Sequence, residues 1–507
     1  MIKNAREKIC LISPPTRSNV QVIPIALVYL AAWLEKEGID TEIIDIKISP
    51  FKSPDSITEE KIIQKTVRRI SESRTSFVGI TCFTSEYNSV MRLAQAIKRH
   101  MNVKIVIGGV HSTLRPEDFI YEGSPVDIAV IGEGEETITE LVRQYADQAL
   151  LKNINGIAFL ENGIMRMTPA RSLIEDLARL PLPSYDKLDM DYYLTMTKYI
   201  IRYIFTSGAH ILTSRGCPFL CTFCAVKNLW KTPDNKVKVR HKSVSQIIDE
   251  IQYLRGKYSM DSFYIADDTF AMGKDRAIEF CDEILKRDIK IIWAMETRVN
   301  LVNDTLLKAI KKAGCIQVEF GVESGSQEAL DRMKKGIRVE DTVRAFELCK
   351  KYGLRTFANL MLNTPGETEK DVSETFCLKN RIKASHAGVN LTMPIIGTDI
   401  YEQYVNPKIS KDEYVLFEDA HFYTKILDPR FRLAKHKLNL NRLYYLANIY
   451  NYLNPFFEFT LNLRYLRSIF ASKRKWQLVP CIMSSFLKQI RAYLRFLGNI
   501  FLRIFNR

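Results

Sequence analysis

The sequence predicts an α/β protein with two successive series of alternating strands and helices and a helical C-terminal region. Within residues 1–150, five short apolar runs alternate with stretches of helical periodicity. A second alternating series, with units of about 25–35 residues, fills residues 206–400. At 507 residues the chain also exceeds one typical domain. We therefore expect an N-terminal doubly wound parallel sheet followed by a partial (β/α) barrel.

The N-terminal series, residues 1–150, predicts a parallel sheet whose strand ends form a binding edge. Strands are expected at 8–13, 41–47, 76–83, 103–109 and 126–134, and helices at 25–38, 59–70, 90–101, near 115–122 and at 136–146. Ligands of such sheets bind beyond the carboxyl ends of the strands, where small residues let the backbone approach closely. Those ends carry Ser13, Thr84, Ser85, Gly108, Gly109, His111, Gly132 and Gly134.

Residues 151–205 are expected to be a connector, with a hairpin that turns at residues 161–163. The second series then predicts the barrel. Its strands are expected at 210–216, 262–268, 290–298, 315–324, 355–366 and 388–397, and its helices at 243–258, 275–288, 304–314, 339–353 and from about 369. The active face of such a barrel lies where the strands end.

The C-terminal region, residues 401–507, predicts long helical segments and carries most of the excess positive charge. Residues 459–507 contain ten Lys or Arg and no Asp or Glu, whereas the whole chain has a net charge of +15. Residues 484–507 predict an amphipathic helix with an apolar stripe and a basic stripe. Such a helix could lie on an anionic membrane surface, or its apolar stripe could pack on the barrel.

Composition narrows the class and the compartment. Hydrophobic residues make up 46% of the chain and charged residues 26%, as in a soluble globular protein. Neither a secretory signal nor a run of 18 uncharged apolar residues occurs. Seven scattered cysteines with mostly apolar neighbours indicate buried thiols in a reducing cytoplasm: Cys10, Cys82, Cys281, Cys315, Cys349, Cys377 and Cys481.

The remaining cysteines, Cys217, Cys221 and Cys224, stand together in the stretch "SRGCPFLCTFCAV". A structural zinc site would need a fourth ligand, and no second paired-cysteine motif is present. The alternative is a 4Fe-4S cluster held by three thiolates, with one iron open for chemistry. We favour the cluster.

These motifs resemble those of a known enzyme family. "CPFLCTFC" resembles the CxxxCxxC loop of the radical S-adenosylmethionine (SAM) superfamily, and "YIADDTF", "WAMETRVN", "FGVESGS", "MLNTPGETEKD" and "PIIGTDIYEQ" resemble its later segments in order, over residues 210–402. Residues 8–145, with "IGGVHST" and "VIGEGEET", resemble the Rossmann-like cobalamin-binding domain of one subfamily. The block lacks the DxHxxG motif, so the sequence assigns no lower ligand of cobalt.

The resemblance implies three cofactors: a 4Fe-4S cluster, SAM and cobalamin. It implies that Cys217, Cys221 and Cys224 hold the cluster. Implied contacts to SAM are Phe223, Asp267, Asp268, Arg298, Glu323 and Ser324. The eight strand-end residues named above are the implied contacts to cobalamin. Packing for Phe223, helix capping for the two aspartates and a surface role for Arg298 stay open as alternatives.

The implied activity is radical methylation of an unactivated carbon or phosphorus in a small-molecule, natural-product or lipid-like substrate. Cobalamin-dependent oxidative cyclisation or ring rearrangement is the alternative within the same class. An RNA-binding or RNA-modifying protein, or a redox module without turnover, is the alternative of another class. We expect a flavodoxin or ferredoxin as electron donor, no nucleic-acid partner, and a cytoplasmic location with possible peripheral membrane contact. The sequence leaves the substrate and the oligomeric state open.

Overall fold

The computed structural model describes residues 8–15, 22–46, 56–144, 148–232, 234, 236–406, 408–418, 427–453, 463–483 and 487. The chain forms two compact units, and each is assembled from separate segments. The first unit contains residues 1–190, 214–246 and 393–432, and the second contains 191–213, 247–392 and 433–507. The division predicted from the sequence, at 150, 205 and 400, is consecutive, whereas these units are not.

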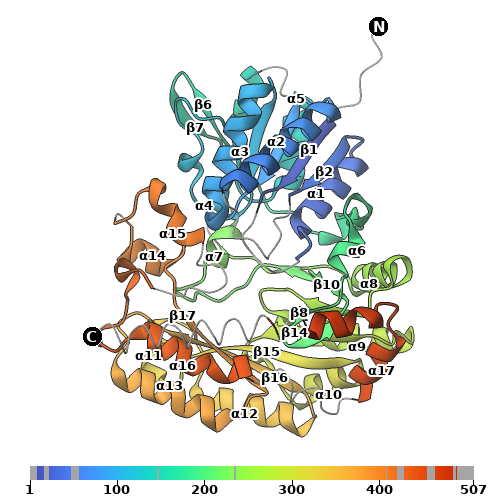
Figure 1. The fold of residues 1–507 in the computed structure, drawn as a ribbon, viewed down its shortest axis with the longest axis vertical. Coiled ribbons are helices and arrows are strands. Elements are labelled where there is room, and N and C mark those ends of the chain that lie inside the picture. The colour runs from blue at the N-terminus through green and yellow to red at the C-terminus, as the bar shows by residue number, and fades with distance from the viewer. Residues whose placement is uncertain are drawn as a thin grey trace. The chain divides into compact units, whose positions relative to one another are not determined.

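The first unit contains a seven-stranded sheet with the order β2-β1-β3-β4-β5-β6-β7 (Figure 1). Its parallel strands are β1 (Lys8–Ser13), β2 (Asp40–Asp45), β3 (Phe77–Thr81), β4 (Lys104–Gly108) and β5 (Ile128–Val130). The predicted parallel sheet is thus confirmed. The predicted hairpin, β6 (Ile157–Glu161) and β7 (Ile164–Met167), extends this sheet by two antiparallel strands. Its turn residues Asn162 and Gly163 have φ values of 51° and 77°, which an Asn-Gly pair tolerates.

Five helices accompany the parallel strands: α1 (Ile25–Lys36), α2 (Ser56–Ser73), α3 (Tyr87–His100), α4 (Val110–Leu114) and α5 (Gly134–Gln144). The helix predicted near 115–122 is wrong. α4 ends at Leu114, and a single 3-10 turn at Pro116–Asp118 follows. The reason is Pro116, since proline disfavours helical dihedrals in the residue before it. Arg115 accordingly has φ −144° and ψ 66°.

The second unit contains an open sheet of six parallel strands in the order β10-β13-β14-β15-β16-β17, which is a partial barrel. Its strands are β10 (Gly208–Ile211), β13 (Ser262–Ile265), β14 (Ile292–Thr297), β15 (Cys315–Glu323), β16 (Arg355–Leu362) and β17 (His386–Leu391). Helices α9 (Lys274–Lys286), α10 (Asp304–Lys312), α12 (Val339–Lys351) and α13 (Glu369–Ile382) cover one face, and α8 (Val244–Tyr258) precedes β13 (Figure 1). The second predicted α/β series is confirmed.

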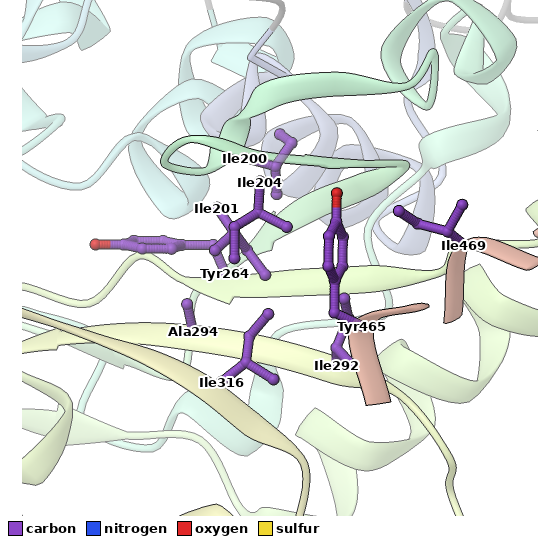
Figure 2. Close-up of a cluster of buried hydrophobic side chains, with 9 residues drawn as sticks. All are labelled: Ile200, Ile201, Ile204, Tyr264, Ile292, Ala294, Ile316, Tyr465 and Ile469. Atoms are coloured by element: carbon purple, nitrogen blue, oxygen red, sulfur yellow. The ribbon is translucent and has the colours of Figure 1, made fainter. Parts of the chain in front are cut away.

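Side chains of β13 and β14 alternate between the two faces of this sheet. Phe263 and Trp293 stack on each other and meet Phe280 of α9. The opposite face meets a hairpin, β8 (Thr197–Ile201) and β9 (Ile204–Thr206). Figure 2 shows the aliphatic cluster on this face: Ile200, Ile201, Ile204, Tyr264, Ile292, Ala294, Ile316, Tyr465 and Ile469. We call this face the inner face, because it lies opposite α9.

The C-terminal segment of the second unit covers an edge of the sheet. Asn448 of α16 (Leu440–Leu453) accepts a hydrogen bond from Val389 N at 3.1 Å and donates one to Val389 O at 2.7 Å. This contact satisfies backbone groups of the edge strand β17. α17 (Leu463–Ala471) packs Tyr465 and Ile469 into the aliphatic cluster. Apart from Leu487, the predicted helix 484–507 lies outside the described residues.

Candidate active site

The residues predicted to contact cobalamin lie along one edge of the first sheet. Ser13 ends β1, Thr84 and Ser85 follow β3, and the glycine pairs at 108–109 and 132–134 follow β4 and β5. These four strands are neighbours and parallel, so their carboxyl ends share one edge. The strand order reverses between β1 and β3, which is the kind of position where such sheets bind ligands.

Glycines give this edge room for a flat, bulky group. A Cβ built on Gly108 or Gly132 would meet no atom within 4 Å. Gly109 has φ +102°, and a Cβ there would lie 2.9 Å from Thr81 Oγ1. A side chain is therefore excluded at Gly109, whereas open space stands before Gly108 and Gly132. The backbone at this edge fits close approach of a ligand such as cobalamin.

His111 lies behind this edge and is fully buried. Its Nδ1 is 2.8 Å from Thr84 Oγ1 and its Nε2 is 2.9 Å from Asp118 Oδ2. Tyr414 also donates a hydrogen bond to Asp118 Oδ2, at 2.9 Å. Because both ring nitrogens are used within the protein, this arrangement favours a role for His111 in holding Thr84 and does not support ligation of cobalt.

The cluster loop, residues 216–225, begins after the short strand β11 (Ser214–Arg215), which pairs with β12 (Arg240–His241). Cys221 is buried, and Cys217 and Cys224 are partly exposed. No disulfide joins these three described thiols. Cys224 N donates a hydrogen bond to Cys221 O at 3.2 Å, so a tight turn separates these two residues.

The other buried thiols are poorer candidates for metal ligands. Burial raises the pKa of Cys349 to about 12 and raises the pKa of Cys315 well above its ordinary value. A ligand must be a thiolate, and burial in apolar surroundings opposes that form. Among the described residues, no three His, Cys, Asp or Glu side chains converge as a single metal ion requires. A 4Fe-4S cluster makes no such demand, because its thiolates bind different irons.

Asp267, a predicted SAM contact, follows β13 and is buried. Its carboxylate accepts a hydrogen bond from Thr213 N at 2.6 Å and a second from the Thr213 hydroxyl. Arg276 Nη2 lies 3.8 Å from Asp267 Oδ2. Thr213 directly precedes Ser214 and the cluster loop, so Asp267 holds the chain where it leaves β10. Asp268 is exposed.

Arg298, Glu323 and Ser324 lie at the ends of β14 and β15 and are buried. Arg298 donates a hydrogen bond to Lys335 O, and Lys335 Nζ is 2.7 Å from Glu323 Oε1. Lys335 thus brings Arg298 and Glu323 together. Ser324 Oγ is 2.9 Å from Thr375 Oγ1 and accepts a hydrogen bond from Ser326 N at 3.1 Å. Phe223, in contrast, belongs to the first unit and is partly exposed.

The inner face of the second sheet carries an ionisable cluster that sequence reasoning missed. Glu296 and Glu319 are paired in register on β14 and β15. Arg202, at the tip of the β8–β9 hairpin, has Nε 3.1 Å from Glu319 Oε2, and its Nη1 donates to Asn359 Oδ1 at 2.9 Å. Tyr264 OH is 3.4 Å from Glu296 Oε2. Figure 2 shows this hydroxyl directed away from Tyr465.

Burial shifts the proton equilibria of this cluster. It raises the pKa of Glu319 to about 7, although Arg202 opposes the shift, and it raises the pKa of Glu296. Burial and then the positive charge of Arg202 lower the pKa of His210 to about 4, so this imidazole is neutral at pH 7. The sequence signal that could have revealed this cluster is the alternation in "CIQVEFGVES", where Gln317, Glu319 and Glu323 share one face of an otherwise apolar strand.

We predict that Glu319→Gln changes how stability depends on pH. Wild-type Glu319 keeps its proton up to about pH 7 when folded, but the unfolded chain loses it near 4.5. Wild-type stability therefore falls relative to the variant as pH rises through this window, by about 3 kcal/mol in total. Chemical denaturation at pH 4.5, 5.5, 6.5 and 7.5 measures the difference. Glu347→Gln, at an exposed position of α12, is the control, and equal slopes for both variants would refute the prediction.

Two family models match the two α/β series of the chain. Residues 211–377 match the family model of the radical SAM superfamily, and residues 16–142 match that of the B12 binding domain. The chain is 32% identical to the uncharacterized methyltransferase PH0819 of Pyrococcus horikoshii, over 88% of this chain and 93% of that protein. It is 28% identical to the anaerobic magnesium-protoporphyrin IX monomethyl ester cyclase of Rubrivivax gelatinosus, over 80% of this chain and 70% of that protein.

A solved structure shares the fold. The radical SAM methyltransferase TsrM of Kitasatospora setae, with cobalamin and a 4Fe-4S cluster bound, superimposes with a TM-score of 0.64 at 20% identity, covering 79% of this chain and 78% of that chain. The chain belongs to the radical SAM superfamily, in the cobalamin-dependent methyltransferase family that joins a B12 binding domain to the barrel. It is an enzyme whose cofactors are a 4Fe-4S cluster, SAM and cobalamin, as the sequence predicted.

Proposed function

We propose that this chain methylates an unactivated carbon or phosphorus of a small, natural-product or lipid-like molecule. The observation that carries the proposal is the relative from P. horikoshii, which is named a methyltransferase and matches almost from end to end. TsrM, likewise described as a methyltransferase, has the same fold. Bound cofactors would supply a radical from SAM and a methyl group from cobalamin.

Residues of the chain have separate roles in this proposal. Cys217, Cys221 and Cys224 hold the cluster, and a reductant such as flavodoxin or ferredoxin supplies electrons. Glu323 is held by Lys335 at the end of β15 and offers its second oxygen to SAM. Open glycine backbone at 108 and 132 receives cobalamin.

Oxidative ring formation is the second candidate, because the cyclase of R. gelatinosus is also similar over most of this chain. The two reactions differ in their products from SAM. Both cleave SAM to 5′-deoxyadenosine, but only methyl transfer also demethylates SAM to S-adenosylhomocysteine.

We predict that the reconstituted enzyme forms both products. The protein is loaded anaerobically with iron, sulfide and hydroxocobalamin, and is then given reductant and SAM carrying a trideuterated methyl group. A small-molecule extract of cells is added as the source of substrate. Mass spectrometry should then find deoxyadenosine, S-adenosylhomocysteine and the heavy methyl group in a small molecule of that extract. Deoxyadenosine without S-adenosylhomocysteine would support cyclisation. The absence of both products would refute radical turnover.

We further infer that the C-terminal segment touches an anionic membrane surface. Phe470, Trp476, Val479, Met483 and Leu487 are 49–81% exposed. In the sequence, Trp476, Val479, Met483 and Leu487 follow one another at intervals of three or four residues, the spacing of one helix face. Exposed cations lie beside them: Arg467, Lys473 and Lys475. Aromatic and apolar side chains among cations are typical of segments that lie in the headgroup region. A lipid-like substrate would agree with this surface. No helix among the described residues is long and apolar enough to span a bilayer.

Vesicle co-sedimentation tests this surface on the full chain. We expect binding to vesicles that contain anionic lipid, weaker binding as salt rises, and a clear loss for Trp476→Ser with Met483→Ser. Ile164→Ser removes an equally exposed apolar side chain on β7 and should leave binding unchanged. Absence of binding to anionic vesicles at low salt would refute the inference.

A further inference from the structure

A buried ion-pair network within the first unit connects two loops that we assign to different cofactors. Arg215 stands two positions before Cys217. Its guanidinium bonds to the carboxylate of Glu133 and, at 2.6 Å, to that of Glu135. These two glutamates flank Gly134, at the edge assigned to cobalamin. Their side chains are only 3% and 8% exposed.

Arg240 completes the network from the strand that pairs with β11. Its Nη1 donates to both Glu133 oxygens, at 2.9 and 2.8 Å, and to Ile174 O at 2.8 Å. Ile174 N in turn donates to Glu133 Oε2 at 2.7 Å. The guanidinium carbons of Arg240 and Arg215 lie 5.5 and 6.0 Å from the ring centroid of Trp230. Two arginines and two glutamates thus balance their charges away from water.

Such a network tolerates little displacement. Separating a buried ion pair leaves uncompensated charges, so the four side chains move together or not at all. Burial opposes the ionised form of Glu135, but the attraction of Arg215 outweighs it and lowers the pKa of Glu135. Tight backbone packing adds to the restraint on the cluster loop. Gly216 has φ +99°, and a Cβ there would lie 2.4 Å from Lys238 O.

The other end of the network restrains the cobalamin edge. Glu133 and Glu135 lie on either side of the first residue of α5, and Gly132 N donates to Thr113 Oγ1 of α4 at 3.1 Å. A shift of the 132–134 backbone would therefore pull on Arg215, and through it on the residues that lead into Cys217. One rigid connection serves both loops.

We propose that Arg215, Arg240, Glu133 and Glu135 are positioning residues that couple the two cofactor sites, so that loading of the cluster strengthens binding of cobalamin and the reverse. This inference rests on the cofactor sites assigned under the proposed function. Each cofactor favours one placement of its own loop, and the network transmits that placement to the other loop. Linkage requires that the coupling be equal in both directions.

The experiment compares the affinity of hydroxocobalamin for the full chain with and without a reconstituted cluster, by anaerobic absorbance titration and without substrate or turnover. We expect at least about fivefold tighter binding to the cluster-loaded protein. Arg215→Lys keeps the positive charge, but a single ammonium group cannot form the two directed ion pairs that the guanidinium forms with Glu133 and Glu135. Glu135→Gln removes one charge of the network at a position that is distant in sequence from the cysteines. Both variants should bring the ratio of affinities close to one while each still binds iron.

Arg171→Lys is the matched control, because Arg171 forms ion pairs with Glu136 and Glu140 of the same helix α5 but lies outside the network. It should keep the wild-type ratio. A wild-type ratio of one would overturn the coupling and leave the cofactor assignment intact. A wild-type ratio retained in Glu135→Gln would equally overturn it. Failure of the wild-type chain to bind cobalamin or iron would overturn the proposed function together with this inference.

Discussion

Replacement of Cys217, Cys221 and Cys224 by alanine is expected to reduce bound iron to background and to abolish formation of 5′-deoxyadenosine. The three thiolates are the proposed ligands of the cluster, and the fourth iron is the proposed binding position of SAM. Iron and sulfide analysis, together with the electron paramagnetic resonance signal of the reduced cluster, measures the first effect. Product analysis after addition of SAM and reductant measures the second.

The control is a second triple variant, Cys281→Ala, Cys349→Ala and Cys377→Ala. Burial raises the pKa of the Cys281 and Cys349 thiols, and Cys377 is exposed on α13. This variant should lose some stability through small cavities but keep its iron. Full iron content in the first triple variant, or loss of iron in the second alone, would show that the cluster is held elsewhere.

Lys335→Met is expected to destabilise the second unit by about 3–5 kcal/mol, because it leaves the carboxylate of Glu323 buried without its cation. The side chains of this pair are 7% and 9% exposed, and their charged atoms are 2.7 Å apart. Gly321 leaves space for this ion pair, because a Cβ there would lie 2.5 Å from Glu323 Oε1 and 2.7 Å from Lys335 Nζ. Urea denaturation at pH 8 measures the loss in free energy of unfolding, because at this pH a buried carboxyl group without a partner is most strongly disfavoured.

Two further variants identify the cause of that loss. Lys335→Met combined with Glu323→Met removes both charges and should recover most of the stability. Lys370→Met breaks an ion pair with Glu328 whose side chains are 66% and 67% exposed, and should cost at most about 1 kcal/mol. An equal loss for Lys335→Met and Lys370→Met would contradict the assigned role of burial. Because Glu323 is a proposed contact of SAM, Lys335→Met and the double variant should both bind SAM more weakly than the wild-type chain.

Much of the fold could be predicted because its signals are local. Apolar runs of strand length that alternate with helical periodicity identified both sheets, and the Asn162-Gly163 turn identified the hairpin. One error came from a choice that periodicity does not settle, because Pro116 ends the predicted helix before residue 115. The hairpin expected in the connector was found, and pairing with β5 adds it to the first sheet. Assembly of each unit from separate segments was equally beyond local patterns.

The candidate site divides in the same way. Parallel strands place their carboxyl ends together, so the strand-end glycines could be grouped from the sequence. Arg202, Glu296 and Glu319 could not, because their cluster depends on where the β8–β9 hairpin meets the sheet. Likewise, His111 was expected at the edge, whereas Thr84 and Asp118 hold it behind that edge.

The sequence by itself determined the family, the three cofactors and the spacing of the cluster cysteines. These follow from short motifs in which the reactive groups are close along the chain. Only the tertiary structure decided which charges are paired. Arg215 meets Glu133 across 82 residues, and Arg202 of the β8–β9 hairpin meets Glu319 of β15. A buried charge must find its partner wherever the fold brings one near, because desolvation is too costly to bear alone. That requirement acts through space, so no local pattern in the sequence records it.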